Sequence, residues 1–196
     1  CCMGDIGVHA ANLAEYVSGL RIASLCADLR ATVPGRQLDD DGAVLLRFEN
    51  DVRGLLNASQ VSAGEENNLR LRVYGDKGGL DWSQQEPNTL WLRWQDRPTE
   101  MLRTGGSYLG QAATDSTRTP MGHPEGYIEA FANIYRDFAN CIRQWDAGQG
   151  AAPSDGDLPG IEAAIRGMQF IETAVAASAS EQKWHHLENL KERSHA

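Results

Sequence analysis

The residues of this 196-residue chain that are best suited to proton transfer lie in Gly4 to Val17, GDIGVHAANLAEYV. Asp5 and His9 are four positions apart, so on an α-helix both side chains project from one face. A carboxylate beside an imidazole can orient the ring, and a histidine exchanges protons near neutral pH. The pair is therefore a candidate acid–base unit. The alternative is that Asp5 caps the helix and His9 packs beneath a sheet, and spacing alone favours that alternative.

Other chemistry finds less support in the sequence. Asp5, His9 and His123 together are a possible zinc or manganese set, although nothing in their spacing demands a metal. His123 is the more interesting third histidine, because it lies where a long loop meets a helix and can line a cleft. There is no phosphate-binding loop and no GxSxG motif, and GQGAAP at Gly148 follows a helix and lacks the third glycine of a dinucleotide fingerprint. Phosphoryl transfer and serine hydrolysis are therefore not indicated.

The elements that must position these residues alternate little between helix and strand. A helix is predicted over residues 6–18, ended by Gly19. Residues 20–104 form a series of apolar, alternating segments with short connections, as in LRLRVYGDKGGLDW. Such a series predicts antiparallel strands. The expected fold is therefore α+β, with an open, largely antiparallel sheet backed by helices on one face.

The second half of the chain predicts a loop and two helices. Residues 105–123 are rich in Gly, Ser and Thr and form a long connection. Pro124 and Glu125 are expected to open a helix with an apolar stripe, and a final helix follows a loop at 146–157. The stripe of the first helix consists of Ile128, Phe131, Ile134, Tyr135, Phe138, Ile142 and Trp145. We expect one domain over residues 1–180 and a charged tail over 181–196, which holds His185, His186 and His195.

Composition limits the partners and the location. The net charge of −9, with no basic block, argues against nucleic acids and anionic membranes, and no apolar run is long enough to span a bilayer. A soluble, cytoplasmic protein with a small neutral or polar ligand is expected. The cysteines form no metal or redox motif, and Cys26 and Cys141 are predicted to be buried, reduced thiols. A chain that begins with Cys and enters a helix at once is also expected to be a piece of something longer.

The tryptophans of DWSQQEPNTLWLRW offer a further surface. Trp82, Trp91 and Trp94 fall on neighbouring strands, where they suit either a core, a sheet face covered by another subunit, or a platform on which a sugar stacks. An open sheet with a polar and aromatic face is also a common dimer surface.

Three stretches together resemble the C-terminal domain of the Gfo/Idh/MocA oxidoreductases, the family of glucose-fructose oxidoreductase and inositol dehydrogenase. They are GDIGVHAANLAEYV, LRLRVYGDKGGLDW and GHPEGYIEAFANIYRDFANCI, and the final helix with ETAVAASASEQKW is also similar to the family's last helix. The resemblance covers nearly the whole chain. Its most specific element is the D-x-x-x-H of Asp5 and His9.

The resemblance implies a substrate-binding and oligomerisation domain of a dehydrogenase that acts on a sugar, inositol or polyol. NAD or NADP would be bound mainly by a separate Rossmann domain, whose GxGxxG and E-K-P motifs are absent here. By this resemblance His9 takes the hydroxyl proton, Asp5 orients or charge-balances His9, and Asn12 contacts the substrate at a position where relatives often have an acid. His123, where the loop meets the helix, is also expected to contact the substrate. The chain alone would be inactive, and homodimers or homotetramers would form through the open sheet face. The rival hypothesis is a non-catalytic binding or assembly module of the same fold.

Overall fold

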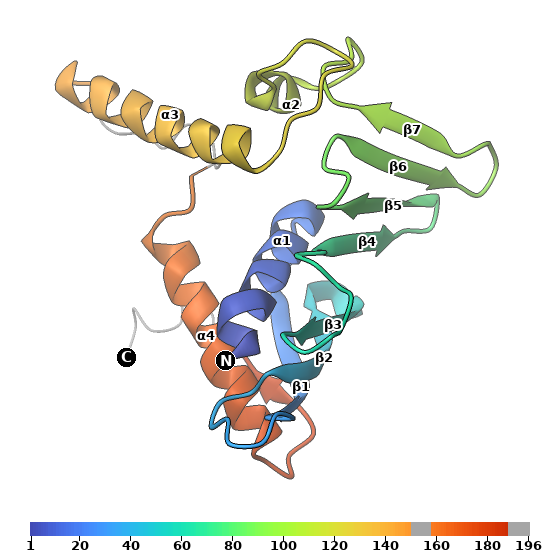
Figure 1. Cartoon of the computed structure of the whole chain (residues 1–196), viewed down its shortest axis with the longest axis vertical. Coiled ribbons are helices and arrows are strands. Elements are labelled where there is room, and N and C mark those ends of the chain that lie inside the picture. Colours follow the sequence, from blue (N-terminus) through green and yellow to red (C-terminus); the bar gives the residue numbers. More distant parts are fainter. Residues whose placement is uncertain (150–157, 188–196) are drawn as a thin grey trace. The chain divides into compact units, whose positions relative to one another are not determined.

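The computed structural model describes residues 1–149 and 158–187, and these residues form two compact units (Figure 1). The first unit comprises Cys1–Glu66 and the chain from Gly160 onward. The second unit comprises Asn67–Pro159. Because the candidate acid–base pair belongs to the first unit, that unit is described first.

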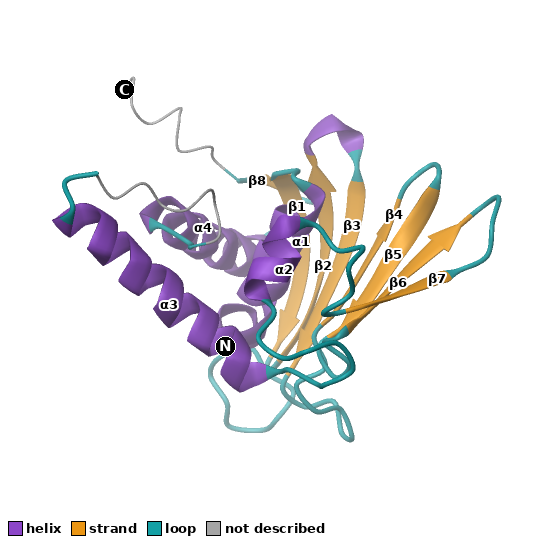
Figure 2. Ribbon diagram, turned by 90° about the horizontal axis from the view of Figure 1, so that it is seen from above, coloured by secondary structure: helices purple, strands orange, loops and turns teal. Residues whose placement is uncertain are grey.

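The first unit is a four-stranded antiparallel sheet with helices on one face (Figure 2). The strand order is β3-β2-β1-β8. The helices are a π-helical turn η1 followed directly by α1, and the long α4. The bounds are η1 Met3–Gly7, α1 Val8–Ser18, β1 Ile22–Arg30, β2 Asp41–Phe48, the 3-10 turn η2 Glu49–Asp51, β3 Arg53–Ser59, α4 Ile161–Ser178 and β8 His185–His186.

Alternation along β2 shows why this sheet has one dry face. Val44, Leu46 and Phe48 are buried, whereas Leu45 and Arg47 between them are exposed. Successive side chains of a strand point to opposite faces, so one apolar row meets the helices and the other row stays open. The core contains Cys2, Met3, Ala11, Ile22, Leu25, Val44, Leu46, Phe48, Leu56, Ala58, Phe170, Ala174, Ala177 and Leu187. The expected α+β fold with an antiparallel sheet and helices is confirmed.

The two histidines expected in a charged tail belong to this sheet. His185 and His186 form β8, which pairs with Leu25 and Ser24 of β1, and the next residue, Leu187, is buried. The guanidinium of Arg47 lies 4.2 Å from the centre of the Trp184 ring. Backbone pairing with β1 satisfies a strand edge that a solvated tail would leave open. The division of the chain after residue 180 stays a prediction, and His195 lies outside the described residues.

The second unit contains a separate four-stranded antiparallel sheet, with strand order β4-β5-β6-β7. The strands expected over residues 20–104 are therefore divided between two sheets. The long loop after β7 also contains a short helix, α2, which was not predicted because residues 105–123 have no apolar periodicity. The bounds are β4 Arg70–Tyr74, β5 Gly78–Ser83, β6 Thr89–Trp94, β7 Glu100–Arg103, α2 Gln111–Ser116 and α3 Tyr127–Asp146.

Helix α3 begins later than the sequence suggests. Its first residue is Tyr127, and the N–H of Gly126 donates to Glu129 Oε2 at 2.9 Å, so Glu129 is the acid of the first turn. Glu125 lies before the helix and accepts hydrogen bonds from the backbone N–H groups of Arg118 and Thr119. The prediction of a start at Pro124 and Glu125 was wrong, because Glu125 closes the preceding loop instead.

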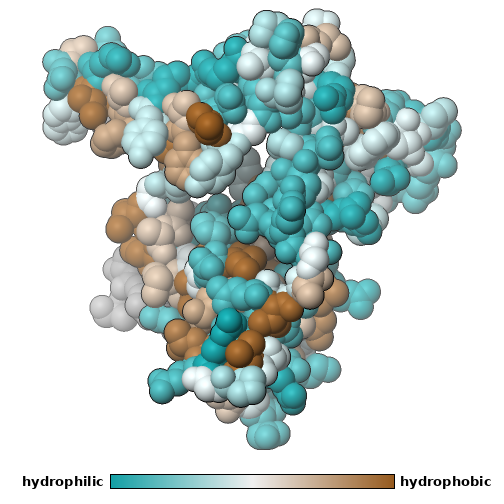
Figure 3. Space-filling model, in the orientation of Figure 1, coloured by the Kyte–Doolittle hydropathy of each residue, from teal (hydrophilic) through white to brown (hydrophobic). Residues whose placement is uncertain are grey.

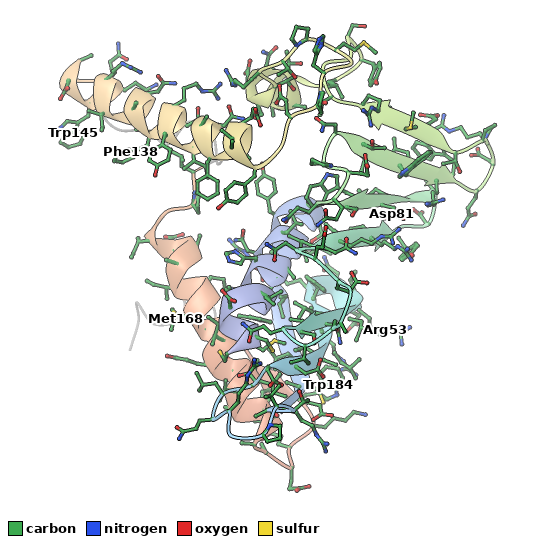
Figure 4. The ribbon with its side chains drawn as sticks, viewed as in Figure 1. Arg53, Asp81, Phe138, Trp145, Met168 and Trp184 are labelled. Carbon is green, nitrogen blue, oxygen red and sulfur yellow. The ribbon has the colours of Figure 1, made fainter. Side chains whose placement is uncertain are left out.

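The apolar stripe of α3 is not a core in the described residues. All seven of its large side chains are exposed, including Phe138 at 59% and Trp145 at 68%. Both project from the same side of the helix in Figure 4, and Figure 3 shows the hydrophobic surface that the stripe makes along α3. Contiguous apolar patches of this kind mark interaction surfaces.

Register separates the three tryptophans of the second sheet. Trp91 pairs with Asp81 and Met101 across β5 and β7, while Trp82 pairs with Leu90 and Trp94 with Gly78. Alternation then places Trp91 on the face that carries Asp81, and Trp82 and Trp94 on the other face. The three rings therefore do not form one sugar-stacking platform.

The cysteines differ from expectation in burial. All four are free, but Cys26 and Cys141 are half-buried and only Cys2 is buried. Cys26 pairs with Leu45, whose side chain belongs to the open face of the first sheet, and Cys141 lies on the exposed α3. Among the described residues, no helix is both long and apolar enough to cross a membrane.

Candidate acid–base site on the first helix

Asp5, His9 and Asn12 lie in one helical segment, and all three side chains are exposed. Asp5 belongs to the π-helical turn η1, whereas His9 and Asn12 belong to α1. The N–H of Val8 donates to the carbonyl of Met3, five residues earlier, so the turn is wider here than in an α-helix. Single π-turns in helices are frequent at functional sites. Because its side chain is exposed, His9 is not a core histidine.

The start of this helix is capped by Asp39, from the connection between β1 and β2. Asp39 Oδ2 accepts from Met3 N and from Cys2 Sγ, both at 3.0 Å, and the Asp39 carbonyl accepts from Cys2 N at 2.9 Å. These contacts satisfy N–H groups that a helix leaves without internal partners. Burial and the Asp39 carboxylate raise the pKa of the Cys2 thiol to about 12, so Cys2 stays a neutral donor. Because Asp39 is the cap, the Asp5 carboxylate does not serve that purpose.

Gln60 is the contact of Asp5 that the sequence did not suggest. Its Nε2 donates to Asp5 Oδ2 at 3.0 Å, and its backbone N–H donates to the carbonyl of Asp40 at 2.8 Å. One carboxylate oxygen of Asp5 is thus held by the side chain of Gln60, whose backbone is itself fixed by Asp40. Within the described residues, no hydrogen bond joins Asp5 to His9. Gln60 follows the last residue of β3, 55 positions from Asp5, so only its place at the end of a strand hinted at a role.

Asp40 holds the connection that carries Asp39. The carboxylate is buried and accepts from Thr32 N and Thr32 Oγ1, each at 2.7 Å, from Val33 N at 3.0 Å and from Arg36 Nη1 at 3.1 Å. The backbone N–H of Thr32 is the main cause that lowers the pKa of Asp40 from 3.8 to about 2, with further help from Thr32 Oγ1, Val33 N and Arg36. Asp40 is therefore ionised under all ordinary conditions.

Asp40→Asn is expected to flatten the acid limb of the stability curve. The folded-state pKa lies below the ordinary value, so ionised Asp40 stabilises the fold above pH 3.8 and that contribution is lost as the pH falls through about 2. The amide also turns a donor toward backbone N–H groups, so the variant is less stable at neutral pH. Urea unfolding at several pH values measures both effects. Equal acid slopes in the two proteins would refute this role of Asp40.

His123 belongs to the second unit and is exposed. Its ring Nδ1 lies 3.2 Å from the carbonyl of Pro120, and its backbone carbonyl accepts from Thr119 Oγ1 at 3.1 Å. A proton on Nδ1 would be bound by that carbonyl, which leaves Nε2 as the acceptor nitrogen. The place of His123 in one site with His9 stays a prediction. Among the described residues, no group of three or more His, Cys, Asp or Glu side chains is arranged to hold a metal ion.

The sequence and structure of this chain are similar to those of known oxidoreductases. Residues 1–81 match the model described as the GFO/IDH/MocA C-terminal domain. An oxidoreductase structure from Sinorhizobium meliloti is 43% identical, with a TM-score of 0.87 over 94% of this chain and 51% of that chain. An inositol dehydrogenase homolog from Azotobacter vinelandii, complexed with NADH and myo-inositol, is 30% identical, with a TM-score of 0.88 over 94% of this chain and 49% of that one.

A curated relative agrees with these structures. The uncharacterized oxidoreductase YfiI of Bacillus subtilis (strain 168) is 29% identical over 184 residues, which are 93% of this chain and 47% of the relative. The chain is thus similar to oxidoreductases of the Gfo/Idh/MocA family, whose C-terminal domain model matches residues 1–81, and it spans about half the length of the relatives that it matches.

Proposed function

We propose that this chain is the substrate-binding part of an NAD(P)-dependent dehydrogenase that oxidises or reduces a CH–OH group of a sugar, inositol or related polyol. The observation that carries the proposal is the exposed carboxylate and imidazole of Asp5 and His9 on a helix whose start is fixed by Asp39. The 30% identity to an inositol dehydrogenase homolog complexed with NADH and myo-inositol supports the substrate class.

The side chains of the helix have separate tasks in this proposal. For oxidation, a ring nitrogen of His9 accepts the hydroxyl proton while the electron pair of the O–H bond forms the carbonyl. The Asp5 oxygen that Gln60 does not hold orients His9 or accepts from a substrate hydroxyl, and the Asn12 amide adds both a donor and an acceptor. A bound nicotinamide would supply the acceptor for the hydride that leaves the carbon. In the reverse direction His9 returns the proton.

The residues of this chain fit the substrate side of such a reaction and not the dinucleotide. The sequence has no GxGxxG and no other phosphate-cradling loop, whereas a carboxylate, an imidazole and an amide suit the hydroxyl groups of a polyol. We therefore assign NAD or NADP mainly to an adjoining Rossmann domain. The cytoplasmic location also stays a prediction.

The test has two parts. Calorimetric titration of NAD⁺ and NADP⁺ into the 196-residue chain is expected to show no binding at micromolar concentrations, and tight binding would overturn the assignment of the cofactor. The complete protein that carries this chain is expected to reduce NAD⁺ or NADP⁺ in the presence of myo-inositol or a related polyol. A complete protein that binds NAD(P) but oxidises no member of a polyol and sugar panel would favour the binding or assembly module.

We also propose that the open face of the first sheet joins copies of the protein as a dimer or tetramer. Leu45 and Leu55 are directly paired across β2 and β3 and are 47% and 72% exposed. Arg53 lies two residues before Leu55 on β3, so it shares that face, and Trp184 comes directly before β8 (Figure 4). Arginine and tryptophan are enriched at subunit interfaces, and neighbouring exposed apolar side chains mark interaction surfaces.

Leu55→Arg is expected to dissociate this assembly, because a closed two-fold interface places the new charge close to its own copy. Light scattering of the wild type and the variant at equal concentration measures the mass. Met168→Arg is the matched control, since Met168 is 54% exposed but lies on α4, which covers the other face of the sheet (Figure 2). A monomeric wild type, or an unchanged mass for Leu55→Arg, would reject this face as the interface.

A further inference from the structure

A cluster of charges in the second unit has no part in the proposed reaction. Asp81 of β5 is 4% exposed, and three arginines converge on its carboxylate. Arg70 binds both oxygens, with Nε at 3.1 Å and Nη2 at 3.0 Å, while Arg93 Nη2 and Arg72 Nε each lie 3.3 Å from Oδ2. Hydrogen bonding by Arg70 is the main cause that lowers the pKa of Asp81, which therefore stays ionised.

Strand register explains why these side chains meet. Arg72 pairs with Asp81 across β4 and β5, and Gly79 pairs with both Tyr74 and Arg93. Directly paired residues project to the same face of a sheet, so Arg72, Tyr74, Asp81 and Arg93 share one face. Gly79 between Tyr74 and Arg93 adds no side chain to that face, and the surface is hollow there.

The hollow is a surface pocket of about 310 Å³. Arg72, Tyr74, Asp81 and Arg93, which share one face of the sheet, all line it, and Leu80 and Trp94 line it as well. Three positive charges surround one negative charge, so the site is cationic in a chain whose net charge is −9. Arg72 contacts Asp81 through Nε, and its two terminal nitrogens make no hydrogen bond among the described residues.

We propose that this pocket binds a small oxyanion, the carboxylate or phosphate group of a low-molecular-weight ligand. Guanidinium groups present paired donors that match both kinds of oxyanion. Asp81 holds the arginine side chains in place before a ligand arrives, so less side-chain entropy is lost on binding. Tyr74, which shares the sheet face of Arg72 and Arg93, then offers apolar contact for the rest of the ligand. The site lies in the second unit and uses none of Asp5, His9 or Asn12, so it goes beyond the proposed reaction.

The experiment titrates inorganic phosphate and, separately, citrate into the wild-type chain, with amide chemical shifts of β4–β6 as the readout. We expect saturable shifts for at least one probe, and the better probe identifies the oxyanion. Arg93→Ala and Arg72→Ala are each expected to weaken that binding about tenfold or more, because each removes charged donors. Raising the salt concentration is expected to weaken it further.

The matched control is Arg143→Ala, which removes the same charge from an exposed residue of α3. It is expected to leave binding unchanged. Circular dichroism shows whether each variant remains folded. Arg72→Lys keeps the positive charge but loses the planar guanidinium group with its paired donors, so it is expected to bind the oxyanion with intermediate affinity. The proposal is overturned if neither probe shows saturable shifts at the pocket, or if Arg143→Ala weakens binding as much as Arg93→Ala does.

Discussion

His9→Ala in the complete protein is expected to lower kcat by about 10²- to 10⁴-fold, the range that a positioned acid–base group contributes. His9 is exposed on α1, so its removal leaves no cavity in the core. The affinity for NAD⁺ or NADP⁺ is expected to change little, because the proposed cofactor site lies on other residues. Steady-state kinetics with the preferred polyol and a separate nucleotide titration measure the two quantities.

The control for this substitution is His186→Ala, which removes an exposed imidazole from β8 in the same unit. Its kcat is expected to stay within about twofold of the wild type, as for a surface residue without a role. Asp5→Asn is expected to lower kcat as well, since the amide keeps the shape of the side chain but loses its charge. A His9→Ala enzyme with near-normal turnover would remove this residue from the chemical step.

Arg166→Met is expected to lower the free energy of unfolding by about 3–5 kcal/mol, the usual effect of breaking a buried ion pair. Arg166 Nη2 donates to Glu15 Oε1 at 2.7 Å and also to the carbonyl of Ile22, while Ile22 N donates to the same Glu15 oxygen at 2.7 Å. Glu15 and Arg166 are each 9% exposed. This pair therefore ties α1, β1 and α4 together, and Arg166→Met leaves the Glu15 carboxylate buried without its main partner.

Two further variants show whether the lost pair causes the effect. Arg21→Met removes the exposed partner of Glu15, 3.1 Å from Oε2, and is expected to cost less than about 1 kcal/mol. Glu15→Gln combined with Arg166→Met is expected to recover part of the loss, because no buried charge remains unpaired while Oε1 can still accept from Ile22. Urea unfolding measures the free energy of unfolding of the wild type, the two single variants and the double variant. Equal losses for Arg21→Met and Arg166→Met would contradict this account.

The same ion pair shows what periodicity misses. The apolar positions of residues 161–178 predicted a helix correctly, and α4 runs from Ile161 to Ser178. Arg166 is nevertheless one of its most buried residues, because Glu15 of another helix neutralises it. A charged residue is assigned to the surface by pattern alone, and only the fold brings its partner to it. The apolar stripe of α3 shows the reverse, because periodicity predicted the helix but the large apolar side chains of the stripe are exposed among the described residues.

The sequence by itself determined the local elements of this protein and its most chemically suggestive residues. Strict alternation in β2 and β4, the glycine after α1 and the spacing of Asp5 and His9 are local features, and local sterics and hydrogen bonding are sufficient to express them. Only the tertiary structure decided which groups meet. Asp39 caps the first helix, Gln60 reaches Asp5 and three arginines surround Asp81, because loop closure and strand register bring together residues that are distant along the chain.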